Sequence, residues 1–308
     1  MFDRDYRQGI MLSLVTAGML GIGATLAKYA LEKINPVFLA FLDLFLGFFL
    51  FAPFVLLRRK ALLPRQASKK ELNILLKLAI SGTAIPLVLI LYGLELTSSI
   101  QGAFLIQLQS IFGIILARIL LKETVLEKQR YGLFLIIAGS FLIILRDPQS
   151  ILDFFRVKGL LGDLLIVSGA IGLGYSYVLS KKLALKIEPE LVVSFRLFAG
   201  WLFLIPLLPI LLITGIQLID FSPHLFLTTF FYIVTNFCIA YVTMQMALEI
   251  LPSWMVAAFT QIMPLFTVAT SFFFLRESIT ALVILGGILI LLGGFILLMQ
   301  IEKHNSPN

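Results

Sequence analysis

The sequence predicts an all-α integral membrane protein with ten transmembrane helices, arranged as two five-helix repeats of inverted topology. Three observations predict this fold. Of the 308 residues, 60% are hydrophobic and only 13% are charged, whereas a soluble domain is about 45–50% apolar and about 25% charged. The hydrophobic residues fall into ten long stretches. The second half of the chain also repeats the first half.

The ten stretches match the length that a membrane demands. A bilayer core of about 30 Å needs about 20 apolar residues per helix. The expected spans are residues 10–30, 36–57, 72–94, 99–120, 130–146, 159–180, 190–213, 223–248, 253–275 and 280–300. The connections between them are short, the longest polar stretches being 58–71 and 146–158, so no soluble domain is expected.

The positive charges predict the orientation. Fifteen Lys and Arg residues fall on the side of the termini: Arg4, Arg7, six between 58 and 70, three between 122 and 130, three between 181 and 186, and Lys303. Five lie opposite: Lys33, Arg146, Arg156, Lys158 and Arg276. Positive charge gathers in cytoplasmic loops. Both termini are therefore expected in the cytoplasm, with the chain in the cell (inner) membrane. The net charge of +7 reflects this topology, so lipid and a small molecule are the expected partners, not nucleic acid.

The repeat appears when the chain is shifted by 154 positions. The shift aligns polar residues and glycines that chance would rarely align in so apolar a chain. The aligned pairs are Glu95 with Glu249, Gln107 with Gln261, Gly132 with Gly286 and Gly139 with Gly293. Nearer the start of each half a shift of 153 aligns Pro36 with Pro189 and Pro53 with Pro206. A shift of 151 aligns Gly21-Ile-Gly23 with Gly172-Leu-Gly174.

The repeat divides the chain into residues 1–150 and 151–308, with five expected helices in each. An odd number of helices makes the second copy enter the membrane from the opposite side. Such inverted repeats are typical of secondary transporters, which bind substrate near the midplane at the interface of the repeats.

Two further motifs accompany the repeat: Leu121-Lys-Glu123-Thr and Leu275-Arg-Glu277-Ser, each with its paired glycines, and the segment from Ala247-Leu-Glu249 to Pro264-Leu-Phe. In these motifs the sequence resembles the drug/metabolite transporter superfamily, and within it a protein of two EamA repeats. Arg196, followed by Leu-Phe-Ala, resembles the Arg often found early in the second helix of a repeat. The first half departs from the second, with Ser110 in place of Pro264 and Asp43 in place of Arg196. The resemblance implies carriers of small metabolites, often exporters of amino acids or related compounds.

The expected function is secondary transport, with export of a small organic metabolite such as an amino acid, by alternating access around a cavity between the repeats. The alternatives are an importer or exchanger of a nucleotide-like metabolite, and a non-transporting or enzymatic membrane protein. The sequence has no Gly-x-x-x-x-Gly-Lys-Ser/Thr loop for nucleotide and no metal-ligand spacing. We therefore expect no enzyme activity, cofactor or metal. The sequence does not indicate an oligomeric state.

Ionisable groups within the expected spans need an explanation, because each is costly in a bilayer. Lys28 lies eight residues before Pro36 and Asp43 seven after it. At about 1.5 Å per residue the two therefore lie at similar depth in a helical hairpin. They are candidates for a structural ion pair or for coupling. Arg196 is expected to extend to the cytoplasmic surface, and a role in binding substrate is the alternative.

Uncharged polar residues are candidates for lining the cavity. Gln107 and Gln261 are repeat mates that either pair across the repeats or line the cavity. The eighth helix carries Tyr232, Asn236, Tyr241 and Gln245. Tyr241 and Gln245 are one turn apart, whereas Tyr232 is about two and a half turns before Tyr241 and is expected on a different face. Tyr175 and Trp254 complete the candidate set. Pro86 and Pro264 interrupt their helices and are candidate hinges.

Overall fold

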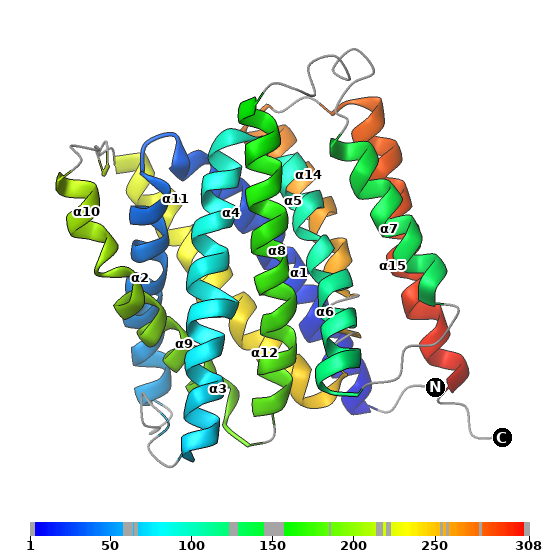
Figure 1. Ribbon diagram of the computed structural model, residues 1–308, viewed down its shortest axis with the longest axis horizontal. Helices are drawn as coiled ribbons and strands as arrows, with labels where there is room; N and C mark the ends of the chain where they lie inside the picture. Colours follow the sequence, from blue (N-terminus) through cyan, green and yellow to red (C-terminus); the bar gives the residue numbers. More distant parts are fainter. Residues whose placement is uncertain are drawn as a thin grey trace.

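Long apolar helices packed side by side make up the computed structural model (Figure 1). The structure describes residues 4–57, 64, 67–122, 129–144, 157–184, 186–213, 218–219, 223–252, 255–256, 259–276 and 279–304. These residues contain no β-strand, and Ile34 and Ile219 form an isolated bridge. The N-terminal helix begins and the C-terminal helix ends at the same end of the bundle (Figure 1).

The helices of the two halves follow one another in the same order. Those of the first half are α1 (Arg4–Leu31), α2 (Pro36–Leu57), α3 (Lys69–Ala79), η1 (Ile80–Ala84), α4 (Ile85–Leu96), α5 (Ser99–Ile106), α6 (Leu108–Leu120) and α7 (Gln129–Ile144). Those of the second half are α8 (Val157–Leu183), α9 (Pro189–Leu204), α10 (Leu207–Ile213), α11 (Pro223–Ile233), η4 (Val234–Ala240), α12 (Tyr241–Ile250), η5 (Thr260–Ile262), α14 (Met263–Phe274) and α15 (Ala281–His304).

The helices have the length and composition of membrane spans. Among the described residues, seven continuous helical segments are long and apolar enough to cross a bilayer, from Tyr6–Leu31 to Pro223–Ile250. Two shorter apolar helices follow at Thr260–Phe274 and Ala281–Ile296, and the 16-residue α7 packs against α15. The all-α membrane class predicted from composition is therefore confirmed.

Two helices are interrupted by π-helical turns at equivalent places in the two halves. The turn η1 (Ile80–Ala84) separates α3 from α4, and η4 (Val234–Ala240) separates α11 from α12. A shift of 154 places the start of one turn on the start of the other. Pro86 follows η1 directly. Its missing N–H cannot continue the α-helical hydrogen-bond ladder, so the sequence accounts for the interruption in the first half. No proline follows η4.

The repeated Leu-Lys-Glu and Leu-Arg-Glu motifs end two equivalent helices with the same backbone. After α6, Lys122 has a φ of 58°, and after α14, Arg276 has a φ of 53°. This left-handed conformation closes many helix C-termini, where glycine usually occupies the position. The two residues of each half that follow, 123–124 and 277–278, include Glu123 and Glu277, which lie outside the described residues.

Glycines bring α7 and α15 into close contact in a two-fold arrangement. A Cβ atom on Gly139 would meet the carbonyl oxygen of Gly286, and a Cβ atom on Gly293 would meet that of Gly132. Each contact becomes the other when the halves are exchanged, because 132 and 139 correspond to 286 and 293. The later residue of α7, Gly139, contacts the earlier residue of α15, Gly286, and the earlier Gly132 contacts the later Gly293. The two helices therefore run antiparallel.

A second pair of glycine contacts corrects the alignment of the first helix in each half. Gly21 lies against Met263, Phe266 and Thr267 of α14, while Gly174 lies against the residues 109, 112 and 113 of α6. These three positions are the repeat mates of 263, 266 and 267. The mate of Gly21 is therefore Gly174, at a shift of 153, rather than Gly172. From the sequence, either Gly172 or Gly174 could be the mate of Gly21. Only the contacts with the neighbouring helix distinguish the two.

We predict that Gly139→Ala destabilises the protein by about 1–3 kcal/mol, because overpacking a tight contact forces the backbones apart. Gly113→Ala is the matched control, since the nearest atom to its Cβ would be 3.7 Å away. Both changes raise helix propensity equally. Thermal unfolding of the detergent-purified variants measures the difference. Equal melting temperatures for the two variants would show that the α7–α15 contact is not tight.

Candidate functional site

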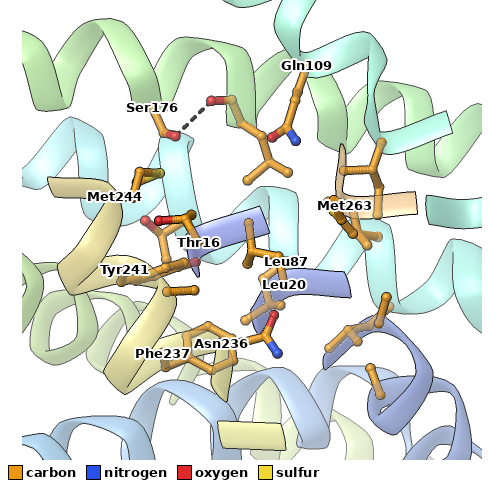
Figure 2. Close-up of a pocket in the computed structure, with 18 of the residues that line it drawn as sticks. Thr16, Leu20, Leu87, Gln109, Ser176, Asn236, Phe237, Tyr241, Met244 and Met263 are labelled. Atoms are coloured by element: carbon orange, nitrogen blue, oxygen red, sulfur yellow. Dashed lines mark hydrogen bonds between the residues drawn. The ribbon is translucent and has the colours of Figure 1, made fainter. Parts of the chain in front are cut away.

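A central cavity of about 100 Å³ lies between the two halves of the chain. Its wall combines helices of both halves, and Figure 2 shows their side chains around the same space. The polar lining residues of the first half are Thr16, Thr83 and Gln109, and those of the second half are Ser176, Tyr177, Arg196, Tyr232, Asn236 and Tyr241. Most of the remaining wall is apolar, including Leu20, Leu87, Phe237, Met244 and Met263.

Arg196 does not extend to the surface as predicted. Its side chain on α9 is 1% exposed and lines the cavity. Nε donates to the hydroxyl of Thr83 at 3.0 Å, and Nη2 to the carbonyl of Gly82 at 3.5 Å. The guanidinium carbon lies 3.9 Å from the ring centroid of Tyr241, a cation–π contact. The prediction was wrong because the tertiary structure places this helix face against the π-helical turn η1 of the other half.

Tyr232, Asn236 and Tyr241 line the cavity together, although Tyr232 was predicted on a different face from Tyr241. Nine residues make two and a half α-helical turns, which would place the two rings on opposite sides. The intervening η4 turn winds with i→i+5 hydrogen bonds, so it holds more residues per turn. Phe237 packs edge-on against both rings, with centroid distances of 5.8 Å to Tyr232 and 5.1 Å to Tyr241. The π-helical turn therefore brings both tyrosines to one face.

Asn236 reaches the wall because α1 carries glycine opposite it. A Cβ atom on Gly23 would overlap the amide group of Asn236. The amide nitrogen donates to the carbonyl of Tyr232 at 3.3 Å and to the hydroxyl of Thr235 at 3.2 Å. Any larger residue at position 23 would therefore displace the asparagine from its place in the wall.

Gln107 and Gln261 meet across the two halves and do not line the cavity. Nε2 of Gln261 donates to the backbone carbonyl of Gln107 at 3.4 Å, while Nε2 of Gln107 donates to the carbonyl of Ala103 at 3.3 Å. Both side chains are buried. The sequence left open whether these two residues pair across the repeats or line the cavity, and the structure supports a contact between the repeats. The glutamine in the cavity wall is Gln109.

The other polar candidates lie away from the cavity. Tyr175 packs in an apolar cluster with Leu75 and Leu179, and its neighbours Ser176 and Tyr177 line the wall instead. Gln245 is fully buried, and its Nε2 donates to the carbonyl of Ser180 at 3.4 Å. Trp254 lies outside the described residues.

The structure does not bring Lys28 and Asp43 together as an ion pair. Nζ of Lys28 donates to the carbonyls of Leu94 and Thr97 at 2.6 and 2.7 Å, near the end of α4. The last carbonyls of a helix have no partner within the helix, and they carry its negative dipole end. The ammonium group satisfies them, and α1 is thereby fixed to α4.

Lys181 makes the same contacts in the second half, and the sequence analysis missed it as the mate of Lys28. Its Nζ donates to the carbonyls of Leu248 and Leu251 at 2.9 Å each. Positions 248 and 251 are the repeat mates of 94 and 97, and 181 follows 28 by the shift of 153 that aligns this part of each half. That shared shift is the signal that could have identified Lys181.

Asp43, the repeat mate of Arg196, is fully buried on α2. Its carboxyl group lies next to the phenol of Tyr232, but no described residue donates a hydrogen bond to either oxygen in good geometry. Asp43 does not line the cavity itself, but it lies next to Tyr232, which does. An acidic and a basic residue therefore occupy equivalent positions in the two halves, each beside a tyrosine of the wall.

Both candidate hinge prolines lie at the start of a helix after an irregular turn. Pro86 begins α4 after the π-helical turn, and Pro264 begins α14 after the short 3₁₀ turn η5. The first half breaks at the equivalent place without a proline, because α5 ends at Ile106 and α6 begins at Leu108. A hinge at either proline stays a prediction.

Comparison with known proteins agrees with this geometry. The sequence profile of the EamA-like transporter family matches residues 7–145 and again residues 160–299, one match in each half. The chain belongs to the EamA-like transporter family.

Relatives and a solved structure cover nearly the whole of this EamA-like transporter. It is 28% identical over 271 residues to an uncharacterized transporter of Archaeoglobus fulgidus, covering 87% of this chain and 90% of that protein. It is also 28% identical over 297 residues to an uncharacterized transporter of Methanothermobacter thermautotrophicus, covering 93% and 85%. A solved crystal structure matches 96% of this chain and 99% of its own, with a TM-score of 0.71 and 15% identity. That structure supports the fold alone.

Family membership makes this EamA-like transporter a multi-pass membrane protein whose partners are lipid and a small-molecule substrate. Among the described residues, no three His, Cys, Asp or Glu side chains gather into a group that could hold a metal.

We predict that Lys28→Met and Lys181→Met each lower stability by about 1–3 kcal/mol, because buried carbonyls lose their donor. Met keeps most of the apolar stem. Lys77→Met is the control, since that side chain is exposed on α3. Thermal unfolding of purified protein measures all three variants. Because Lys28 and Lys181 are repeat mates, the two variants should lose similar stability. If either Lys28→Met or Lys181→Met melted at the same temperature as Lys77→Met, the shared role would be contradicted.

Proposed function

We propose that the chain is a secondary transporter that exports a small organic metabolite by alternating access around the central cavity. Ten transmembrane helices form two inverted five-helix repeats. The protein lies in the cell membrane with both termini in the cytoplasm. The observation that carries the proposal is the position of the cavity between two halves whose contacts are related by a two-fold exchange.

The two-fold contacts support the inverted topology. The glycine contacts of α7 with α15 exchange into one another, and the two helices are antiparallel. A two-fold axis that relates antiparallel helices is perpendicular to them. If those helices cross the bilayer, the axis lies in the membrane plane, as it does in inverted-repeat transporters.

Irregular helices around the cavity suit alternating access. The π-helical turns η1 and η4 supply Thr83 and Asn236 to the wall, and π-helical turns are frequent at functional sites. Lys28 and Lys181 fix the ends of α4 and α12, which lie at opposite ends of the bundle (Figure 1). Each half therefore has a rigid outer end and an irregular segment at the cavity. Rocking of one half against the other closes the cavity at one end and opens it at the other.

A labelling experiment tests the topology. In a Cys238→Ser background, which removes the one native cysteine, Lys122→Cys and Arg276→Cys place single thiols at repeat-equivalent positions. We expect an impermeant maleimide to label position 276 in intact cells, and position 122 only after the membrane is opened. Labelling of both from the same side would contradict the inverted topology.

Counterflow in proteoliposomes, with a panel of labelled amino acids, nucleosides and organic acids, tests transport. We expect selective, saturable exchange of one chemical class. Ala27→Phe should abolish it, because Ala27 lines the cavity and a phenyl ring there fills it. Ala281→Phe, at an exposed position of α15, should leave exchange unchanged.

The melting temperature of each variant shows that it is folded. Exchange that persists at wild-type rate in a folded Ala27→Phe variant would exclude the central cavity as the pathway. Lower intracellular accumulation of the same compound in cells that produce the protein would support export.

A further inference from the structure

The guanidinium group of Arg196 is held in the cavity wall with part of its hydrogen-bonding capacity unused. A guanidinium group has five N–H donors in a planar fork. Nε and Nη2 donate to Thr83 and Gly82, but Nη1 has no hydrogen-bond acceptor among the described residues. No described carboxylate forms an ion pair with Arg196, whose repeat mate Asp43 lies behind Tyr232. A buried cation without an anion is strongly unfavourable, so this side chain favours an anionic ligand.

The surroundings fix the plane of this fork. The Tyr241 ring covers one face of the guanidinium at 3.9 Å, and Thr83 holds the Nε side. The Nη1 side is left for a ligand. Arg196 is 1% exposed, so a ligand reaches it only when neighbouring side chains such as Tyr241 shift. A planar fork of this kind binds carboxylate through two parallel hydrogen bonds.

The rest of the wall offers no place for a positive charge. Arg196 is the single charged side chain among the described residues that line the cavity, and no Asp or Glu is among them. Most of the lining is apolar, with Leu20, Leu87 and Met263 facing the space (Figure 2). The neutral hydroxyl and amide groups of the wall suit an uncharged oxygen. An amino acid would bring an ammonium group, and the wall has no anion to pair with it.

We propose that the cavity binds a small organic monoanion, a carboxylate on an apolar body without an ammonium group, and that Arg196 is its anchor. A binding site in this cavity matters for flux only if the chain is a carrier, so the assignment rests on the transport function proposed above. An oxo acid with a branched or aromatic body meets every requirement of the wall.

Three probes with the same isobutyl body test the assignment. They are 4-methyl-2-oxopentanoate, leucine and 3-methylbutylamine, which carry a carboxylate, both charges and an ammonium group, respectively. Binding to the purified full-length protein is measured by isothermal titration calorimetry in detergent. We expect the oxo acid to bind roughly tenfold or more tightly than leucine, and the amine to show no binding.

Variants of Arg196 separate an anchor from a structural residue. Arg196→Gln should weaken binding of the oxo acid roughly ten- to hundredfold, the loss expected for hydrogen bonds to a charged group. It should also abolish the preference for the oxo acid over the amine. Arg196→Lys, which keeps the charge but not the fork, should retain that preference with weaker binding. Arg118→Gln is the control, because Arg118 is exposed at the end of α6.

The outcomes distinguish this assignment from the transport function. Tighter binding of leucine than of the oxo acid, binding of no acid, or unchanged selectivity in a folded Arg196→Gln variant would overturn it. Counterflow of an amino acid that is independent of Arg196 would overturn the anchor and leave transport standing. Arg196-dependent binding of the oxo acid without counterflow of any compound would support the anchor and contradict transport.

Discussion

The close approach of helix backbones at glycine holds this bundle together. Lipid tails are as apolar as leucine, so burial of apolar surface gives little drive for helix association in a bilayer, and tight packing must supply it. Gly93 and Gly162 each lie against the carbonyl of the other, and Gly139 and Gly293 lie against carbonyls of the facing helix. These contacts set the distances between helices, and so they set where the central cavity can exist.

Once the helices are this close, every irregular backbone segment must be satisfied within the protein. The hydroxyl of Thr83 donates to the carbonyl of Leu78 in the π-helical turn of the first half, while its oxygen accepts from Arg196. Lys28 and Lys181 likewise donate hydrogen bonds to backbone carbonyls, at the ends of two helices. Of these three side chains, Thr83 also lines the cavity.

The two halves share a backbone but differ in charge, and this difference gives the cavity its chemistry. Asp43 and Arg196 occupy equivalent positions, yet only Arg196 lines the cavity. The repeat mate of Tyr241 is Leu87, and most of the polar wall comes from the second half. In the transport function proposed above, the duplicated scaffold provides the movement and the divergence of one copy provides recognition.

Apolar length and a fixed shift of polar residues and glycines depend on nothing outside the chain, so the sequence was enough to predict the membrane class and the repeat. It also identified Tyr232, Asn236 and Tyr241, which the structure places in the wall. The tertiary structure decided the rest. Arg196 was assigned to the surface because its depth was judged on an isolated helix, and Lys28 was paired with Asp43 by depth alone. The register of Tyr232 depended on a π-helical turn that has no proline after it. Which face of a helix meets a neighbour is a property of packing between helices, and in a chain this apolar no periodic pattern of hydrophobic residues reveals it.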